Sequence, residues 1–206
     1  MKIVLGIVAA LVVVVAIWAL VQYRGIQRAA DCTAKEVTSG SMTKTGDTWH
    51  IDFTSRFDAP VDKVFDAFGH PEQAVQYVPE NVMKSEVVKE DGNTKVVDVI
   101  GRLDILPPGF KVQNLRTEYT VFPAEHRITS RSIDFKLADI DSTYRFEPAD
   151  GGKATLLKFT QTSKQKQQLL VEALQKGALC ETYVTQVRAV NRALGLAPPA
   201  GHPQAG

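Results

Sequence analysis

The clearest periodicity of apolar and polar residues lies near the carboxyl end of the chain, over residues 162–194. Apolar side chains recur there in steps of three and four, with Leu174 and Val184 on one face. This spacing is typical of an amphipathic helix. The opposite face carries polar residues such as Glu181 and Gln186, which suit contact with water. We therefore predict one long helix that buries a single face.

The predicted boundaries of this helix rest on local signals. Thr162 and Gln165 have the spacing of a capping box, which marks a helix start. Gly195 follows the last periodic residue and has the position of a helix C-cap. A helix of roughly 30 residues spans about 45 Å, so its apolar face needs a large surface to cover.

Upstream, the period changes to two, which is typical of half-buried strands. We predict strands at 49–57, 82–90, 94–105, 112–122, 126–133, 140–147 and 154–162, with short helices at 60–68 and 71–78 after the first of them. Short turns join consecutive strands, so the sheet should be antiparallel with one face covered. The predicted fold class is α+β: a curved antiparallel sheet of about seven strands wrapped on the long carboxyl-terminal helix.

The amino terminus carries an uncharged apolar run of 19 residues, 3–21. About 20 such residues are needed to span a bilayer, whereas a signal-peptide core usually has about 7–15. Trp18 and Tyr23 lie where interfacial aromatic residues are common. We predict an uncleaved transmembrane signal anchor over 1–23, with a cleaved signal peptide as the alternative.

Two features of the sequence bear on which side of the membrane the domain occupies, and they favour opposite sides. The flanking charges favour a cytoplasmic domain, whereas a very short amino tail before a signal-like span favours export. We expect a single-pass membrane protein whose domain is extracytoplasmic.

Residues 24–45 are polar without a sustained period and are predicted to be a linker. Residues 197–206 are predicted to be a disordered tail, leaving 46–196 as one domain.

Composition and motif content limit the kinds of binding and catalysis that the chain can support. The chain has 24 Lys and Arg against 23 Asp and Glu, a formal net charge of +1, so no basic excess indicates nucleic-acid binding. Its two cysteines, Cys32 and Cys180, lie near the membrane end and in mid-helix, so we expect no disulfide between them. Metal-ligand spacings, phosphate loops and nucleophile elbows do not occur. We expect no metal, no cofactor and no catalytic residue.

Three stretches carry a resemblance to known proteins. They are FTSRFDAPVDKVFDAFGHPEQAVQYVPE, TEYTVFPAEHRITSRS and STYRFEPADGGKATLLKFTQTSK, the last of which runs into the predicted terminal helix. Over about residues 46–196 the chain resembles the START-like, or SRPBCC, superfamily of helix-grip proteins, which includes polyketide cyclases and lipid-transfer domains. The resemblance implies a cavity between sheet and helix, where members bind lipids, sterols, polyketides or plant hormones, and some catalyse cyclisation or hydrolysis.

Strand parity and helical spacing predict which side chains line that cavity. The predicted ligand-binding residues are Phe53, Val99, Tyr119, Tyr144, Phe146, Leu157, Leu170 and Tyr183. Polar residues on inward faces, including Ser55, Thr117 and Gln161, favour a partly hydrated pocket over a dry core. The alternative is that they bond across the sheet or lie at strand ends.

These patterns predict a membrane-tethered protein that binds or transports a lipid or another hydrophobic small molecule. A tether concentrates a carrier beside its lipid source. A cyclase or dehydrase-like enzyme and a protein-interaction module with a vestigial cavity are the alternatives. The sequence shows no acid–base constellation, which favours binding over catalysis.

Overall fold

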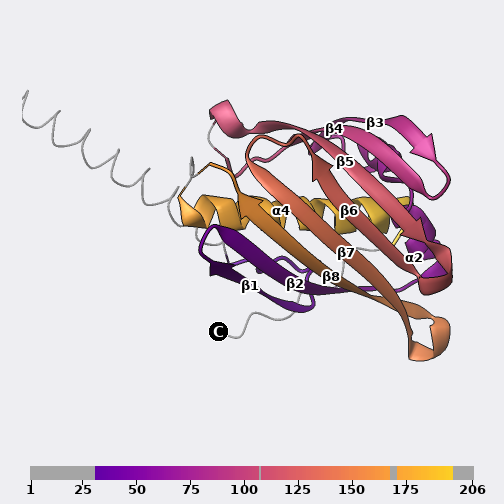
Figure 1. Cartoon of the computed structure of the whole chain (residues 1–206). Helices are drawn as coiled ribbons and strands as arrows, with labels where there is room; N and C mark the ends of the chain where they lie inside the picture. The colour runs from indigo at the N-terminus through magenta and orange to yellow at the C-terminus, as the bar shows by residue number, and fades with distance from the viewer. Residues whose placement is uncertain (1–30, 107, 168–170, 197–206) are drawn as a thin grey trace, which may run out of the picture.

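The computed structural model describes residues 31–106, 108–167 and 171–196. Within these ranges, one antiparallel sheet curves around a long helix, α4 (Figure 1). The predicted anchor, 1–23, and tail, 197–206, lie outside the described residues. Among the helices that are described, none has the length and apolar character needed to cross a membrane.

The sheet contains eight strands in the order β1-β2-β8-β7-β6-β5-β4-β3, and neighbouring strands are antiparallel. The strands are β1 (Ser39–Thr45), β2 (Thr48–Phe57), β3 (Val82–Asp91), β4 (Thr94–Arg102), β5 (Val112–Phe122), β6 (Arg127–Ile133), β7 (Ala138–Ala149) and β8 (Ala154–Gln165). The α-helices are α2 (Val61–Phe68), α3 (Ala74–Tyr77) and α4 (Glu172–Ala193). Short 3-10 helices occur at η1 (Pro71–Gln73), η2 (Pro108–Phe110), η3 (Pro123–Glu125) and η4 (Asp150–Gly152). The helix-grip architecture is confirmed, with eight strands where about seven were predicted.

The additional strand, β1, lies in the segment predicted to be a linker. Its sequence, SGSMTKT, is largely exposed, and it pairs with β2 at the edge of the sheet. Gly40 permits a close approach to β2, because a Cβ there would lie 2.2 Å from the Asp52 carbonyl oxygen. Hydrophobic periodicity does not detect such a strand, because its backbone pairing holds it in place and few of its side chains are buried.

The long helix begins later than predicted. Thr162 and Gln165 are not a capping box but belong to β8, where they lie opposite His50 of β2 and Ala138 of β7. Strands on both sides satisfy the backbone groups of β8, so the strand continues beyond the predicted boundary. The inward assignment of Leu174 and Val184 on α4 is confirmed by exposures of 8% and 5%.

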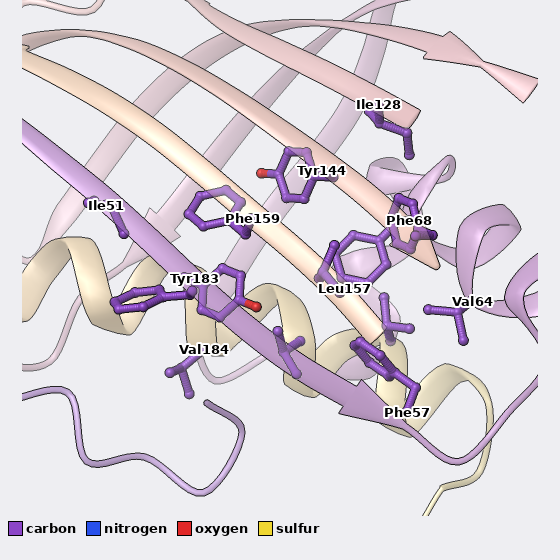
Figure 2. Close-up of a cluster of buried hydrophobic side chains, with 14 of the residues drawn as sticks. Ile51, Phe57, Val64, Phe68, Ile128, Tyr144, Leu157, Phe159, Tyr183 and Val184 are labelled. Atoms are coloured by element: carbon purple, nitrogen blue, oxygen red, sulfur yellow. The ribbon is translucent and has the colours of Figure 1, made fainter. Parts of the chain in front are cut away.

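One hydrophobic cluster fills much of the space between the sheet and α4 (Figure 2). The ring centroid of Phe159 lies 4.6 Å from that of Tyr183 and 4.9 Å from that of Tyr144. Phe68 of α2 packs at one end of this cluster, 5.2 Å from Phe146 between ring centroids. Such aromatic pairs each contribute about 0.5–1.5 kcal/mol beyond area burial, so they hold helix and sheet at a defined separation.

Residues 31–38 form a strap that lies along α4 beside β2. Cys32 of the strap forms a disulfide with Cys180 of α4, across a sequence separation of 148 residues. The expectation of two unpaired cysteines is therefore wrong. That expectation failed because strand β1 was not predicted. β1 turns the chain back along β2, and this places the preceding strap beside the middle of α4.

The strap has further polar attachments. Glu36 is 5% exposed and accepts hydrogen bonds from Arg188 of α4 at 3.1 Å from Nε and 3.0 Å from Nη2. Its carbonyl oxygen accepts a hydrogen bond from Ser55 Oγ at 2.5 Å, and the same hydroxyl lies 2.7 Å from Tyr183 Oη. A buried carboxylate with its cation and a satisfied carbonyl thus join strap, sheet and helix.

Candidate ligand cavity

A cavity of about 180 Å³ lies between α2, α3, strands β3 and β4, and the carboxyl-terminal half of α4. We call it the apolar lobe, because hydrocarbon side chains form most of its wall. Those side chains include Ala67, Phe68, Ala74, Val82, Val99, Ile128, Ala189 and Val190. Such a surface favours the hydrocarbon part of a ligand.

A second space of about 160 Å³ lies between strands β5 to β8 and the amino-terminal half of α4. We call it the polar lobe, because hydroxyl and amide side chains alternate there with hydrocarbon ones. The hydroxyls and amides include those of Gln113, Thr117, Ser130, Ser132, Ser142, Gln161, Ser163, Gln165, Gln175 and Thr182. These groups come from four strands and one helix, so only the folded sheet brings them together.

The two lobes adjoin each other, because they share wall residues. The shared residues are Leu103, Gln113, Leu115, Tyr119, Tyr144, Thr182 and Gln186. At this junction Tyr144 Oη donates a hydrogen bond to Gln186 Oε1 at 2.8 Å. Burial raises the pKa of Tyr144 to about 12 and also raises that of Tyr119. Both hydroxyls therefore remain protonated near neutral pH and can donate hydrogen bonds.

The segment after β4 closes part of the cavity. Leu103 and Leu106 line it, and α4 holds this segment through Glu181. The Glu181 carboxylate accepts hydrogen bonds from the backbone N–H groups of Asp104 and Ile105 at 3.0 and 3.4 Å. Burial raises the pKa of Glu181 above its usual value. The sequence pattern placed Glu181 on the water-facing side of the long helix, but in the structure it positions a wall of the cavity.

The predicted lining residues fall into three groups. Val99, Tyr119 and Tyr144 line the cavity. Phe53, Phe146, Leu157 and Tyr183 are packed in the hydrophobic cluster, and Figure 2 shows Leu157 and Tyr183 there. Leu170 lies outside the described residues. Strand parity identified the inward face correctly, but it does not show where that face is packed and where it is open.

Sequence reasoning missed Gln186, which it placed on the water-facing side of the long helix. In the structure this side chain reaches the junction of the two lobes and bonds to Tyr144. Its position three residues after Tyr183 is the signal that could have identified it, because side chains at this spacing share a helix face.

A wider hollow of about 660 Å³ lies on the outer face of the sheet. Side chains such as Thr129, Thr143 and Thr160 line it, and it is open to solvent. Small-molecule sites usually enclose roughly 70–90% of the ligand surface, which the inner cavity can do and this open face cannot. The described residues contain no group of His, Cys, Asp and Glu placed to hold a metal.

A curved antiparallel sheet that grips a carboxyl-terminal helix around an internal cavity defines the helix-grip class of proteins. Residues 48–193 match the family described as polyketide cyclase/dehydrase and lipid transport. Since this match covers most of the chain, the protein belongs to that family.

Solved structures share this fold. The Zhui aromatase/cyclase from Streptomyces sp. R1128 is 17% identical, with a TM-score of 0.57, covering 73% of this chain and 99% of that one. A START superfamily protein from Mycobacterium smegmatis is 13% identical, with a TM-score of 0.58, covering 71% and 97% of the two chains. These identities establish similarity of fold. No curated protein matches the chain significantly.

Proposed function

We propose that this protein binds or transports a lipid or another hydrophobic small molecule in the cavity between the sheet and α4. The observation that carries the proposal is that an apolar lobe adjoins a polar lobe at Tyr119 and Tyr144. An amphiphilic molecule matches such a gradient, because each of its parts then contacts surface of the same kind. The lipid-transport description of the family supports this assignment.

The loading of the cavity can be measured directly. Purified full-length protein in detergent micelles is mixed with monolauroylglycerol, laurate and dodecyltrimethylammonium in equal amounts, and native mass spectrometry counts all adducts. The Val99→Trp variant should lose most of the loading seen with the original protein, because the indole fills the apolar lobe. Its melting temperature is measured in parallel, since a larger side chain can also overpack the core.

A matched control comes from the adjacent strand. Val88 of β3 is 46% exposed and is absent from the cavity walls. Val88→Trp therefore adds the same indole outside the cavity, and this variant should bind the amphiphiles to the same extent as the original protein. No adduct on the original protein, or equal loading of a well-folded Val99→Trp variant, would contradict the proposed function.

We also propose that residues 1–23 tether the domain to a membrane with the domain on the extracytoplasmic side. The apolar length of 3–21 supports the tether. The Cys32–Cys180 disulfide supports export, because disulfides persist mainly in oxidising compartments. A tethered binding protein would exchange its ligand with the membrane to which it is attached.

The full-length protein should therefore sediment with membranes and stay there during alkaline carbonate extraction, since only detergent removes a spanning helix. A chain lacking 1–23 should appear in the soluble fraction with the same melting temperature. Protease added outside intact cells, after the outer permeability barrier is opened, should digest the domain. Carbonate-soluble full-length protein would rule out the tether, and protection of the domain until the cells are lysed would rule out export.

A cyclase or dehydrase-like enzyme remains the second candidate, on the evidence of one side-chain pair. His70 lines the apolar lobe, and its Nδ1 lies 2.9 Å from Glu72 Oε1. Burial acts to raise the pKa of Glu72, but hydrogen bonding to His70 and the charge of Lys95 contribute to holding it below its usual value. This carboxylate could orient the imidazole as a base. A carrier releases its bound molecule unchanged, whereas an enzyme releases a product of altered composition or structure.

A further inference from the structure

We infer that the ligand carries an uncharged end bearing hydroxyl or carbonyl groups, and that this end occupies the polar lobe. The inference rests on the proposed function and adds the chemical class of the ligand. It separates neutral amphiphiles, such as acylglycerols or hydroxylated ring systems, from fatty acids, phosphate-bearing lipids and cationic amphiphiles.

The first observation is the absence of charge from the wall of the polar lobe. Among the described residues that line it, none is Asp, Glu, Lys, Arg or His. Arg102 and His70 line only the apolar lobe, and each is already paired with a carboxylate. Arg102 Nε lies 2.9 Å from Asp104 Oδ1, and His70 Nδ1 lies 2.9 Å from Glu72 Oε1.

The cation of α4 that follows Gln186 by two residues, Arg188, is also engaged. Its guanidinium bonds to the buried carboxylate of Glu36. A carboxylate or phosphate in the polar lobe would therefore be desolvated without a partner of opposite charge, and burial of an unpaired charge is strongly unfavourable. An ammonium group would meet the same penalty, since no acid lines the lobe.

The second observation is hydrogen-bonding capacity that a neutral ligand can use. Thr117 is 5% exposed and lines the polar lobe, and its Oγ1 makes no hydrogen bond of normal geometry with any described residue, although it lies close enough to the Tyr119 hydroxyl to act on the pKa of that group. Buried hydroxyls are nearly always paired. Hydroxyl and amide side chains both donate and accept, so the wall can pair with a ligand hydroxyl or carbonyl in either sense.

Most other polar groups of this lobe already have partners within the protein. Ser142 Oγ donates to Gln161 Oε1 at 3.1 Å, and Ser132 Oγ accepts from the Ile140 N–H at 2.9 Å. These bonds hold the wall in place before a ligand enters. Preorganisation of this kind lowers the entropic cost of binding, and it makes the Thr117 hydroxyl, which lacks a hydrogen bond of normal geometry, the best-defined contact for a neutral ligand.

The composition of the adducts in the loading experiment tests the inference. The three competitors share a twelve-carbon chain, and at pH 7.5 their ends are neutral, anionic and cationic. We expect monolauroylglycerol adducts to exceed those of laurate and of dodecyltrimethylammonium by at least about tenfold, a ratio that corresponds to about 1.4 kcal/mol. Adducts that persist in Val99→Trp are subtracted, because they lie outside the cavity.

A pair of matched substitutions locates the contact. Thr117→Val keeps the shape and removes this hydroxyl, so the affinity for monolauroylglycerol should fall about two- to tenfold, as for one lost hydrogen bond, without a lower melting temperature. Thr155 is also buried, but its Oγ1 donates a hydrogen bond to the Ala59 carbonyl oxygen at 2.8 Å. Thr155 does not line the cavity. Thr155→Val should therefore lower the melting temperature and leave the affinity unchanged.

The outcomes separate the two proposals. Loading by all three amphiphiles to the same extent, or preferential loading of laurate or of the cation, overturns the neutral-ligand inference and leaves the proposed function intact. An unchanged affinity in Thr117→Val overturns the placement of the neutral end beside that hydroxyl. Absence of any loading removes the proposed function and the inference together.

Discussion

Reduction of the Cys32–Cys180 disulfide is expected to lower the free energy of unfolding by about 2–5 kcal/mol. The bond closes a loop with a sequence separation of 148 residues, and such a cross-link greatly restricts the unfolded chain. It also joins the strap to the middle of α4, so its loss weakens the covering of the helix. Guanidinium unfolding with and without a reductant measures the difference.

The control for this experiment is the double variant Cys32→Ala with Cys180→Ala. Because it has no disulfide, its unfolding midpoint should not respond to the reductant and should lie near that of the reduced original protein. Two reactive thiols in the oxidised, denatured original protein would show that the bond does not form. The Glu36–Arg188 ion pair involves neither cysteine, so we expect the strap to keep this polar attachment in all of these forms.

Substitution Val184→Asp is expected to destabilise the domain by about 3–5 kcal/mol or prevent its folding. Val184 is 5% exposed and belongs to the hydrophobic cluster that contacts the strap (Figure 2). A carboxylate there would be buried without a hydrogen-bond partner or a cation of its own, which is among the most costly single changes in a protein core. Thermal and denaturant unfolding of the purified protein measure the loss.

Val171→Asp places the same residue type at the other extreme of exposure. Val171 is 65% exposed and is the N-cap residue of α4, where no side-chain cap bond forms. Aspartate is favoured at this position, so stability should be unchanged or slightly higher. Equal melting temperatures for Val184→Asp and Val171→Asp would show that the assigned buried face of α4 is wrong.

Positions in the core were the most predictable part of the fold. Trp49, Ile51 and Phe53 alternate with polar residues along β2 and are 2–3% exposed. Alternation reports burial directly, because each side chain on one face of a strand meets either the core or water. The same argument fails for β1, whose pairing with β2 leaves no hydrophobic signature.

The cavity was predictable in part. Val99, Tyr119 and Tyr144 line it as strand parity indicated, whereas Phe53 and Leu157 share the inward face but are enclosed by other side chains. Side chains of the sheet and α4 pack together in the hydrophobic cluster and leave a cavity elsewhere, and the place of each depends on sheet curvature and on the insertion of α2 and α3. Neither property is encoded in the period of a single strand.

The sequence alone determined the secondary-structure periods, the inward faces of the strands, the buried face of the long helix and the resemblance to helix-grip proteins. These follow from local rules, because spacing along one element decides which side chains share a face. Tertiary structure alone decided the pairing of Cys32 with Cys180, the place of β1, the boundary between β8 and α4, and the uncharged wall beside Thr117. Each of these depends on contacts between residues distant in sequence, whose meeting is set by the packing of the whole sheet against α4.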